Sequence, residues 1–197
     1  MQQPRRLAVI DGHPDADPAR FVHALSRRYA EGAASFGHEV RRIDIADLDF
    51  PLVRQRSDWE GEAPPADIRQ AQETILWAEH LLILYPLWLG DVPALLKAFL
   101  EQVMRPGFAF APVVAGRFPR KLLKGRTARL VVTMGMPALF YRAYYGAHSV
   151  KSFERNILRF AGIQPVEHLL IGNVEGASDE ARAQWLDTLF SFGADGI

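Results

Sequence analysis

The sequence predicts an open α/β fold, in which a parallel sheet of five strands is covered by helices on both faces. Two observations predict it. Five short apolar runs alternate with segments whose apolar residues recur at helical spacing. The runs also lack the polar alternation of half-exposed strands, which is typical of parallel strands covered on both sides. Alternating strands and helices require right-handed crossovers, and hence a parallel sheet.

The first two strand–helix units lie within residues 7–78. Residues 7–10 and 40–43 provide the strands, and residues 47–65, which are rich in acidic residues, proline and glycine, predict a long excursion. The first helical face, which closes near Gly37, contains Phe21, Val22, Leu25, Tyr29 and Phe36. The second contains Ile68, Ala71, Ile75 and Ala78.

The third unit carries the most informative pattern. The apolar strand at residues 81–84 stops at Tyr85 and Pro86, and the loop at residues 87–91 keeps large apolar side chains. Pro93 then opens a helix at its first position. Its apolar face consists of Leu96, Phe99, Leu100 and Val103. Open α/β sheets bind flat aromatic ligands where a strand's carboxyl end meets such a loop and helix start.

The remaining segments complete a single domain over residues 1–197. Residues 105–123 are aperiodic, and loops this long usually serve a function or cover a partner. Phe108 and Phe110 of this segment are expected to be exposed on their own chain and buried against a second chain. Strands are expected at residues 130–132 and 166–171, with a helix at residues 153–161 between them. Ser178 is expected to cap a last helix, whose buried side contains Trp185, Leu186 and Leu189.

Composition excludes several classes of function. Lys+Arg and Asp+Glu each number 23, so the net charge is zero and no nucleic-acid or membrane footprint is visible. The absence of cysteine excludes disulfides and thiolate metal sites. No apolar run approaches the roughly 18 residues of a membrane span, and the first residues lack a signal-peptide core. The sequence therefore predicts a soluble, cytoplasmic protein with no membrane span and no nucleic-acid partner.

Other catalytic patterns are missing. The spaced glycines of the dinucleotide fingerprint and the lysine-containing phosphate loop do not occur. The six histidines lack the pairing of a zinc helix, and no serine sits in a nucleophile elbow. No metal site is expected.

The loop after the first strand, residues 11–18, leads into a helix N-terminus, whose free N–H groups favour an anion. His13 could add a donor to a phosphate, and the alternative is that it merely shapes a turn. Asp15 and Asp17 oppose a phosphate, so Arg20 is expected to offset their charge.

The loop after the fourth strand, from Thr133 to His148, contains three tyrosines besides its histidine. Each alone is better explained by ordinary packing. Together, and next to the loop of Trp88, they favour a ligand pocket because tyrosine combines a stacking surface with a polar tip.

The segment from Leu87 to Phe110 resembles a known family. With Pro86 before it, it reads Pro-Leu-Trp-Leu-Gly-Asp-Val-Pro-Ala-Leu-Leu-Lys-Ala-Phe and later Pro-Gly-Phe-Ala-Phe. This pattern is similar to the NAD(P)H:quinone oxidoreductases of flavodoxin-like fold. His13-Pro14, Phe50-Pro51 and the loop after the fourth strand suggest the same family, and the resemblance covers roughly residues 7–172.

The resemblance implies a homodimer that binds FMN or FAD at the carboxyl edge of a flavodoxin-like sheet and uses NAD(P)H as co-substrate. The cofactor-binding residues that it implies are His13, Arg20, Phe21, Pro86, Leu87, Trp88, Leu89, Thr133 and Gly135. It places Tyr141 and His148 where charge is stabilised during hydride transfer, and Phe108 and Phe110 in the partner subunit's substrate pocket. Pro18 stands where the family commonly has serine or threonine, and the spacing from Tyr141 to His148 is one residue longer than in mammalian-type enzymes.

The predicted function is therefore flavin-dependent reduction of quinones or similar acceptors by NAD(P)H. One alternative is an ancillary flavoprotein subunit of a glutathione-gated potassium-efflux system, because similar flavoproteins serve there. A flavodoxin-type electron carrier fits less well, since such carriers tend to be shorter and acidic whereas this chain is neutral.

Overall fold

The computed structural model describes residues 3–60, 63–112 and 118–197. Within them, five parallel strands form one sheet in the order β2-β1-β3-β4-β5. The strands are β1 (Arg6–Asp11), β2 (Glu39–Asp44), β3 (His80–Pro86), β4 (Thr127–Thr133) and β5 (Val166–Ile171). The predicted five-stranded parallel sheet of flavodoxin-like fold is confirmed.

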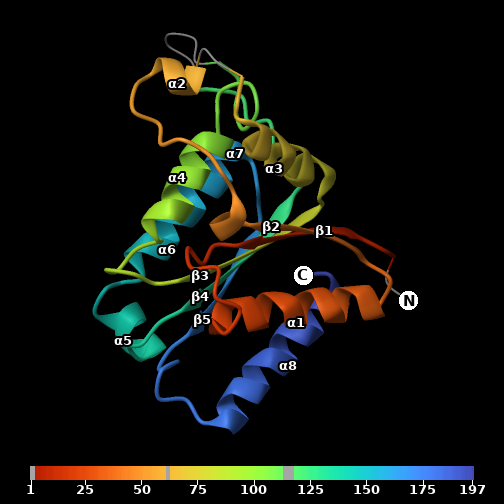
Figure 1. Cartoon of the computed structure of the whole chain (residues 1–197), viewed down its shortest axis with the longest axis vertical. Helices are drawn as coiled ribbons and strands as arrows, with labels where there is room; N and C mark the ends of the chain where they lie inside the picture. Colours follow the sequence, from red (N-terminus) through yellow and green to blue (C-terminus); the bar gives the residue numbers. More distant parts are fainter. Residues whose placement is uncertain (1–2, 61–62, 113–117) are drawn as a thin grey trace.

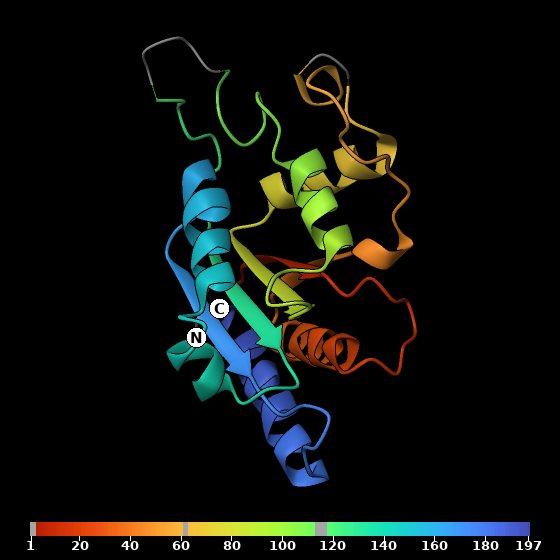
Figure 2. The ribbon, with the colours of Figure 1, turned by 90° about the vertical axis from the view of Figure 1, so that its left-hand side faces the viewer.

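Helices cover both faces of the sheet (Figures 1 and 2). One face is covered by α1 (Phe21–Ser35) and α8 (Asp179–Asp195), and the other by α3 (Ala66–Trp77), α4 (Ala94–Val103) and a helix in three parts. Those parts are α6 (His148–Ser152), the π-helical turn η2 (Phe153–Leu158) and α7 (Arg159–Ala161). Successive strand residues point to opposite faces, so Leu7 and Val9 pack under α1 while Ala8 and Ile10 pack on the other side.

Two glycines allow α1 and α8 to pack side by side (Figure 1). A Cβ atom on Gly32 would stand 2.1 Å from the carbonyl oxygen of Phe190, and one on Gly193 would stand 2.0 Å from that of Tyr29. Any side chain at either position would force the helices apart.

The element boundaries differ from the prediction in three places. β3 continues through Pro86, because Tyr85 and Pro86 still pair with β4. Pro93 is the N-cap of α4, which begins at Ala94. Phe36 lies beyond the end of α1 and is 64% exposed, so it does not belong to the buried helical face.

The acidic excursion folds back onto α4. The 3-10 turn η1 (Ile45–Asp47) leads into it, and it contains α2 (Ser57–Glu60). The indole N–H of Trp59 donates to the carbonyl oxygen of Glu101 at 3.0 Å. The Trp59 ring also lies 5.7 Å from that of Phe110. Phe110 is only 5% exposed, so the expectation of an exposed ring at this position is wrong: its own chain buries it. Phe108 is half-buried, and residues 113–117 of this segment lie outside the described residues.

The loop after β4 also contains more regular structure than the sequence indicated. A short helix, α5 (Ala138–Ala143), follows Pro137, and His148 is already the first residue of α6. In the described part of the chain, no helix is long and apolar enough to cross a membrane.

Candidate functional site

Three loops meet at the carboxyl edge of the sheet, because β1, β3 and β4 are neighbours and run in the same direction. The backbone N–H of Leu87 donates to the carbonyl oxygen of Thr133 at 2.7 Å. The ring of Trp88 meets the ring of His13 edge-on, with 5.8 Å between centroids. The structure thus brings together residues that the sequence assigned to one binding site.

Glycine is required where the first loop leaves β1. The N–H of Gly12 donates to the carbonyl oxygen of Leu84 at 2.7 Å. A Cβ atom on Gly12 would stand 2.7 Å from that same oxygen. A larger residue would therefore push the His13 loop away from β3.

The loop after β3 presents apolar side chains to solvent. Trp88 is 48% exposed and Leu89 is completely exposed. Reciprocal hydrogen bonds of 3.0 Å between Trp88 and Asp91 close the turn, and Leu89 adopts a positive φ of 49°. A left-handed leucine is strained, and strained residues cluster at ligand clamps. Pro86 is the last residue of β3 and is buried at the end of that strand.

His13 is held as a neutral ring. Its Nδ1 faces both the backbone N–H of Asp15, at 3.1 Å, and the backbone carbonyl oxygen of Asp15, at 3.2 Å. The ring is 7% exposed. Burial, and then the charge of His23, lower the pKa of His13, which keeps the ring neutral at physiological pH.

The loop from Gly12 to Arg20, which we call the phosphate loop after the role that its sequence predicts, holds two carboxylates by hydrogen bonds from its own backbone. The N–H of Asp17 donates to Asp15 Oδ1 at 2.9 Å, and the N–H of Ala19 donates to Asp17 Oδ1 at 3.0 Å. Arg20 lies 2.6 Å from Asp15 and 3.6 Å from Asp17, in the offsetting position that the sequence suggested. Among the described residues no side chain caps the start of α1, and within its first turn the N–H of His23 donates to the carbonyl oxygen of Arg20 at 3.0 Å. Phe21 packs with its ring 5.9 Å from Trp185.

A buried histidine–carboxylate pair supports this loop. His23 Nδ1 lies 2.7 Å from Asp11 Oδ2, and His23 Nε2 lies 2.8 Å from the carbonyl oxygen of Asp15. Sequence reasoning missed both residues as functional, because a single histidine on a helix has no periodic signal. The signal that existed was an aspartate ending a buried strand, with a histidine in the first turn of the next helix.

Tyr141 lies in α5 and His148 is the first residue of α6, and the two side chains face different environments. Tyr141 is 1% exposed, and its hydroxyl lies 2.5 Å from Ser149 Oγ in the interior. His148 is exposed and stands over Gly146, where a Cβ atom would come within 2.9 Å of His148 Nε2. The exposed phenols of this loop belong to Tyr144 and Tyr145.

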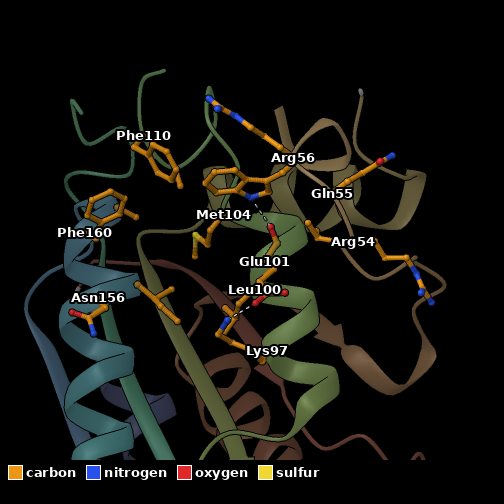
Figure 3. Close-up of a pocket in the computed structure, with 15 residues that line it drawn as sticks. Arg54, Gln55, Arg56, Lys97, Leu100, Glu101, Met104, Phe110, Asn156 and Phe160 are labelled. Atoms are coloured by element: carbon orange, nitrogen blue, oxygen red, sulfur yellow. Dashed lines mark hydrogen bonds and ion pairs between the residues drawn. The ribbon is translucent and has the colours of Figure 1, made fainter. Parts of the chain in front are cut away.

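Two adjoining cavities run along the face between α4 and the η2–α7 helix. The larger, of about 720 Å³, is lined by apolar residues that include Trp59, Met104, Phe110 and Phe160 (Figure 3). The rings of Phe110 and Phe160 lie 5.0 Å apart. The smaller cavity, of about 470 Å³, is lined by Trp88, Leu89 and Ser149 among others. Lys97 and Ile157 line both cavities.

The described residues contain no group of three histidine, aspartate or glutamate side chains placed to hold a metal ion. The chemistry available at this edge is therefore that of apolar surfaces, one neutral imidazole, an acid–arginine cluster and an exposed histidine.

Comparison with known proteins agrees with this geometry. A family model described as flavodoxin-like fold matches residues 5–190. An uncharacterized NAD(P)H oxidoreductase of Haemophilus influenzae is 26% identical, over 91% of this chain and 89% of that protein. The FMN-dependent NADH:quinone oxidoreductase 1 of Hahella chejuensis is 32% identical, over 84% of each chain.

A solved structure shows the same fold. The NAD(P)H:quinone oxidoreductase of Methanothermobacter marburgensis superposes with a TM-score of 0.81 at 21% identity, over 98% of this chain and 97% of that one. The homologues of this chain over most of its length are NAD(P)H:quinone oxidoreductases. The sheet topology, the family match and these relatives together show that the chain belongs to the Flavodoxin_2 family of flavodoxin-like fold.

Proposed function

We propose that the protein is a flavin-dependent oxidoreductase that uses NAD(P)H to reduce quinones or related acceptors. The observation that carries the proposal is the strained, solvent-facing turn of Trp88 and Leu89 at the carboxyl end of β3. Large apolar side chains at that position gain stability when a flat apolar ligand covers them. The relative from Hahella chejuensis is named as FMN-dependent, which supports the same cofactor class.

The residues present fit both ends of a flavin cofactor, its flat ring system and its phosphate. At the ring end, the loop of Leu87 to Leu89 offers an exposed apolar surface between His13 and Thr133. Gly135 is exposed beside it and adds no side chain that would obstruct the edge of the sheet. At the phosphate end, Arg20 neutralises part of the acidic loop, and no described side chain caps the start of α1, where a helix N-terminus favours an anion.

A bound flavin, FMN or FAD, would supply the hydride transfer between NAD(P)H and the acceptor. The chain's own part is binding, orientation and control of water. Trp88 and Leu89 exclude water from one side of the site, and the buried ring of His13 packs edge-on against Trp88. Ser149 lines the smaller cavity, so the hydroxyl of Tyr141 acts on a bound molecule through Ser149. The imidazole of His148 is exposed in the same region of the chain.

We further propose that the protein acts as a homodimer. The two cavities open on the face between α4 and η2–α7, where Trp88, Leu89 and Phe160 are partly or fully exposed. A partner across this face would cover these side chains, and it would bring Phe108 and Phe110 near the other subunit's pocket. Static light scattering at micromolar concentration tests the oligomeric state directly, and a monomer would contradict this part of the proposal.

The decisive experiment for the activity starts with the absorption spectrum of the purified protein, followed by mass spectrometry of the released cofactor. Reconstituted protein is then mixed with NADH or NADPH anaerobically, and with a quinone in a second mixing step. We expect flavin bleaching followed by reoxidation. A protein that retains neither FMN nor FAD after reconstitution would refute the proposed function.

A further inference from the structure

His23 has an oxygen acceptor on each of its two ring nitrogens. Nδ1 faces a carboxylate oxygen of Asp11 at 2.7 Å, and Nε2 faces the carbonyl oxygen of Asp15 at 2.8 Å. A carbonyl oxygen only accepts hydrogen bonds, and so does an ionised carboxylate. Both ring nitrogens must therefore carry hydrogen, and a histidine with two ring hydrogens is a cation.

Asp11 is itself surrounded by donors. It is fully buried, its Oδ1 accepts from the N–H of His13 at 3.3 Å, and Arg42 Nη2 lies 3.7 Å from its Oδ2. These contacts favour the ionised carboxylate. The hydrogen between Asp11 and His23 therefore resides on His23.

A second buried histidine provides a contrast. His38 is 6% exposed, close to the 8% of His23. Its Nδ1 accepts from the N–H of Arg5 at 3.0 Å, while its Nε2 lies 3.0 Å from the carbonyl oxygen of Ala194. One donor and one acceptor require a neutral ring with its hydrogen on Nε2. Two histidines of similar burial are thus assigned different charges by their partners.

The charges around His23 agree with a cation there. Within residues 3–60, 63–112 and 118–197, the carboxylates of Asp11, Asp15, Asp17 and Asp44 face two guanidinium groups, those of Arg20 and Arg42. Without a third cation, two negative charges would stay uncompensated beside the phosphate loop. Burial alone lowers the pKa of His23, but the hydrogen bonds to Asp11 and Asp15 and the charges of Asp11 and Asp44 outweigh it and raise that pKa. The His13 ring, 5.3 Å away, is the remaining titratable neighbour.

We propose that His23 is a positioning residue of the phosphate loop, protonated at neutral pH, which holds that loop in shape and makes it able to accept the phosphate of a bound flavin. Its two hydrogen bonds tie the end of β1 to Asp15, whose backbone also contacts His13 Nδ1. Its charge offsets one of the carboxylates around the loop and, after burial, lowers the pKa of His13. The inference rests on the proposed function and adds to it the residue that selects a phosphorylated flavin.

The charge of His23 is tested without any ligand, by nitrogen-15 NMR of the histidine rings in the intact protein. At neutral pH both nitrogens of His23 should show the shifts of an imidazolium. Those of His38 should show one protonated and one unprotonated nitrogen. A neutral ring at His23 under these conditions would overturn the inference.

The role of that charge is tested by flavin affinity. Riboflavin and FMN are titrated into flavin-free wild type, His23→Gln and the matched control His38→Gln, with flavin fluorescence as the readout. A charge-assisted hydrogen bond sets the expected size of the effect, so His23→Gln should lose roughly 10- to 150-fold in FMN affinity. Riboflavin affinity should not change, because riboflavin has no phosphate, and His38→Gln should bind both flavins as wild type does.

The other outcomes refute different statements. Equal losses for riboflavin and FMN would mean general damage to the site and would overturn the phosphate role, as would no loss at all. If His23→Gln does not fold, the wild type makes the same comparison: FMN affinity should fall with rising alkalinity as His23 deprotonates, and riboflavin affinity should not. If the wild-type protein binds neither flavin, the proposed function and the phosphate role are both refuted. The NMR result still decides the charge of His23.

Discussion

The stability of the protein should depend on pH through His80, the first residue of β3. The ring is 3% exposed, and its Nδ1 lies 2.7 Å from Thr127 Oγ1. Its Nε2 is buried without a hydrogen-bond partner among the described residues. Burial, and then the charges of Arg5 and Arg129, lower the pKa of His80 to about 3. The folded protein therefore keeps this ring neutral, whereas the unfolded chain takes up a proton below a pKa of about 6.5.

The sign and size of the effect follow from this difference. Because the unfolded state binds the extra proton, the free energy of unfolding falls as the pH drops below about 6.5, and the loss continues until about pH 3, where the folded ring also protonates. At about pH 5 the loss amounts to about 2 kcal/mol, and the full difference in pKa corresponds to about 5 kcal/mol. Other titrating groups contribute to the total pH dependence, so the test is a comparison between variants.

Urea unfolding at neutral pH and at about pH 5 measures the effect in wild type, His80→Asn and the exposed control His148→Asn. Asparagine retains a polar atom near Thr127 but does not titrate, so His80→Asn should lose about 2 kcal/mol less than wild type between the two pH values. His148→Asn should behave as wild type does. Equal pH dependence in wild type and His80→Asn would refute the reasoning.

Three further outcomes are expected. Trp88→Ala should weaken flavin binding roughly tenfold through lost stacking area, whereas the exposed and remote Phe36→Ala should not, as flavin fluorescence titration will show. Tyr141→Phe should lower kcat about tenfold or more while flavin affinity stays near that of wild type, and stopped-flow kinetics identical to wild type would leave the tyrosine a packing role only. Phe110→Ala should lower the free energy of unfolding by about 3 to 5 kcal/mol, because the Phe110 ring is buried within its own chain. Phe118 is exposed, so Phe118→Ala should change that free energy little. Urea unfolding measures both variants, and equal stabilities would contradict the burial of Phe110.

The sheet could be predicted because its signal is local. Each strand is an apolar run such as residues 81–84, and the helices between them repeat apolar residues at helical spacing, so element type and order follow from short windows. The meeting of His13, Trp88 and Thr133 was also accessible, since parallel strands end at one edge of a sheet.

What could not be predicted depends on partners that are distant in sequence. Phe110 appeared exposed because nothing near it in the sequence shows that Trp59, from the excursion, and Phe160, from the last turn of a later helix, enclose it. The inward direction of the Tyr141 hydroxyl depends on Ser149 and on a helix that the loop pattern concealed. The pairing of Asp11 with His23 requires the angle between β1 and α1, which no periodicity encodes.

The close packing of α1 against α8 has a consequence for how the protein is made. The phosphate loop leads directly into α1, and the glycine contact at Gly32 and Gly193 joins that helix to α8, which is synthesised much later. During synthesis the apolar side of α1 is therefore uncovered until α8 has emerged and packed against it. The loop that leads into α1 should reach its final shape only at that stage, so the flavin that we propose should bind after α8 has been made and not before.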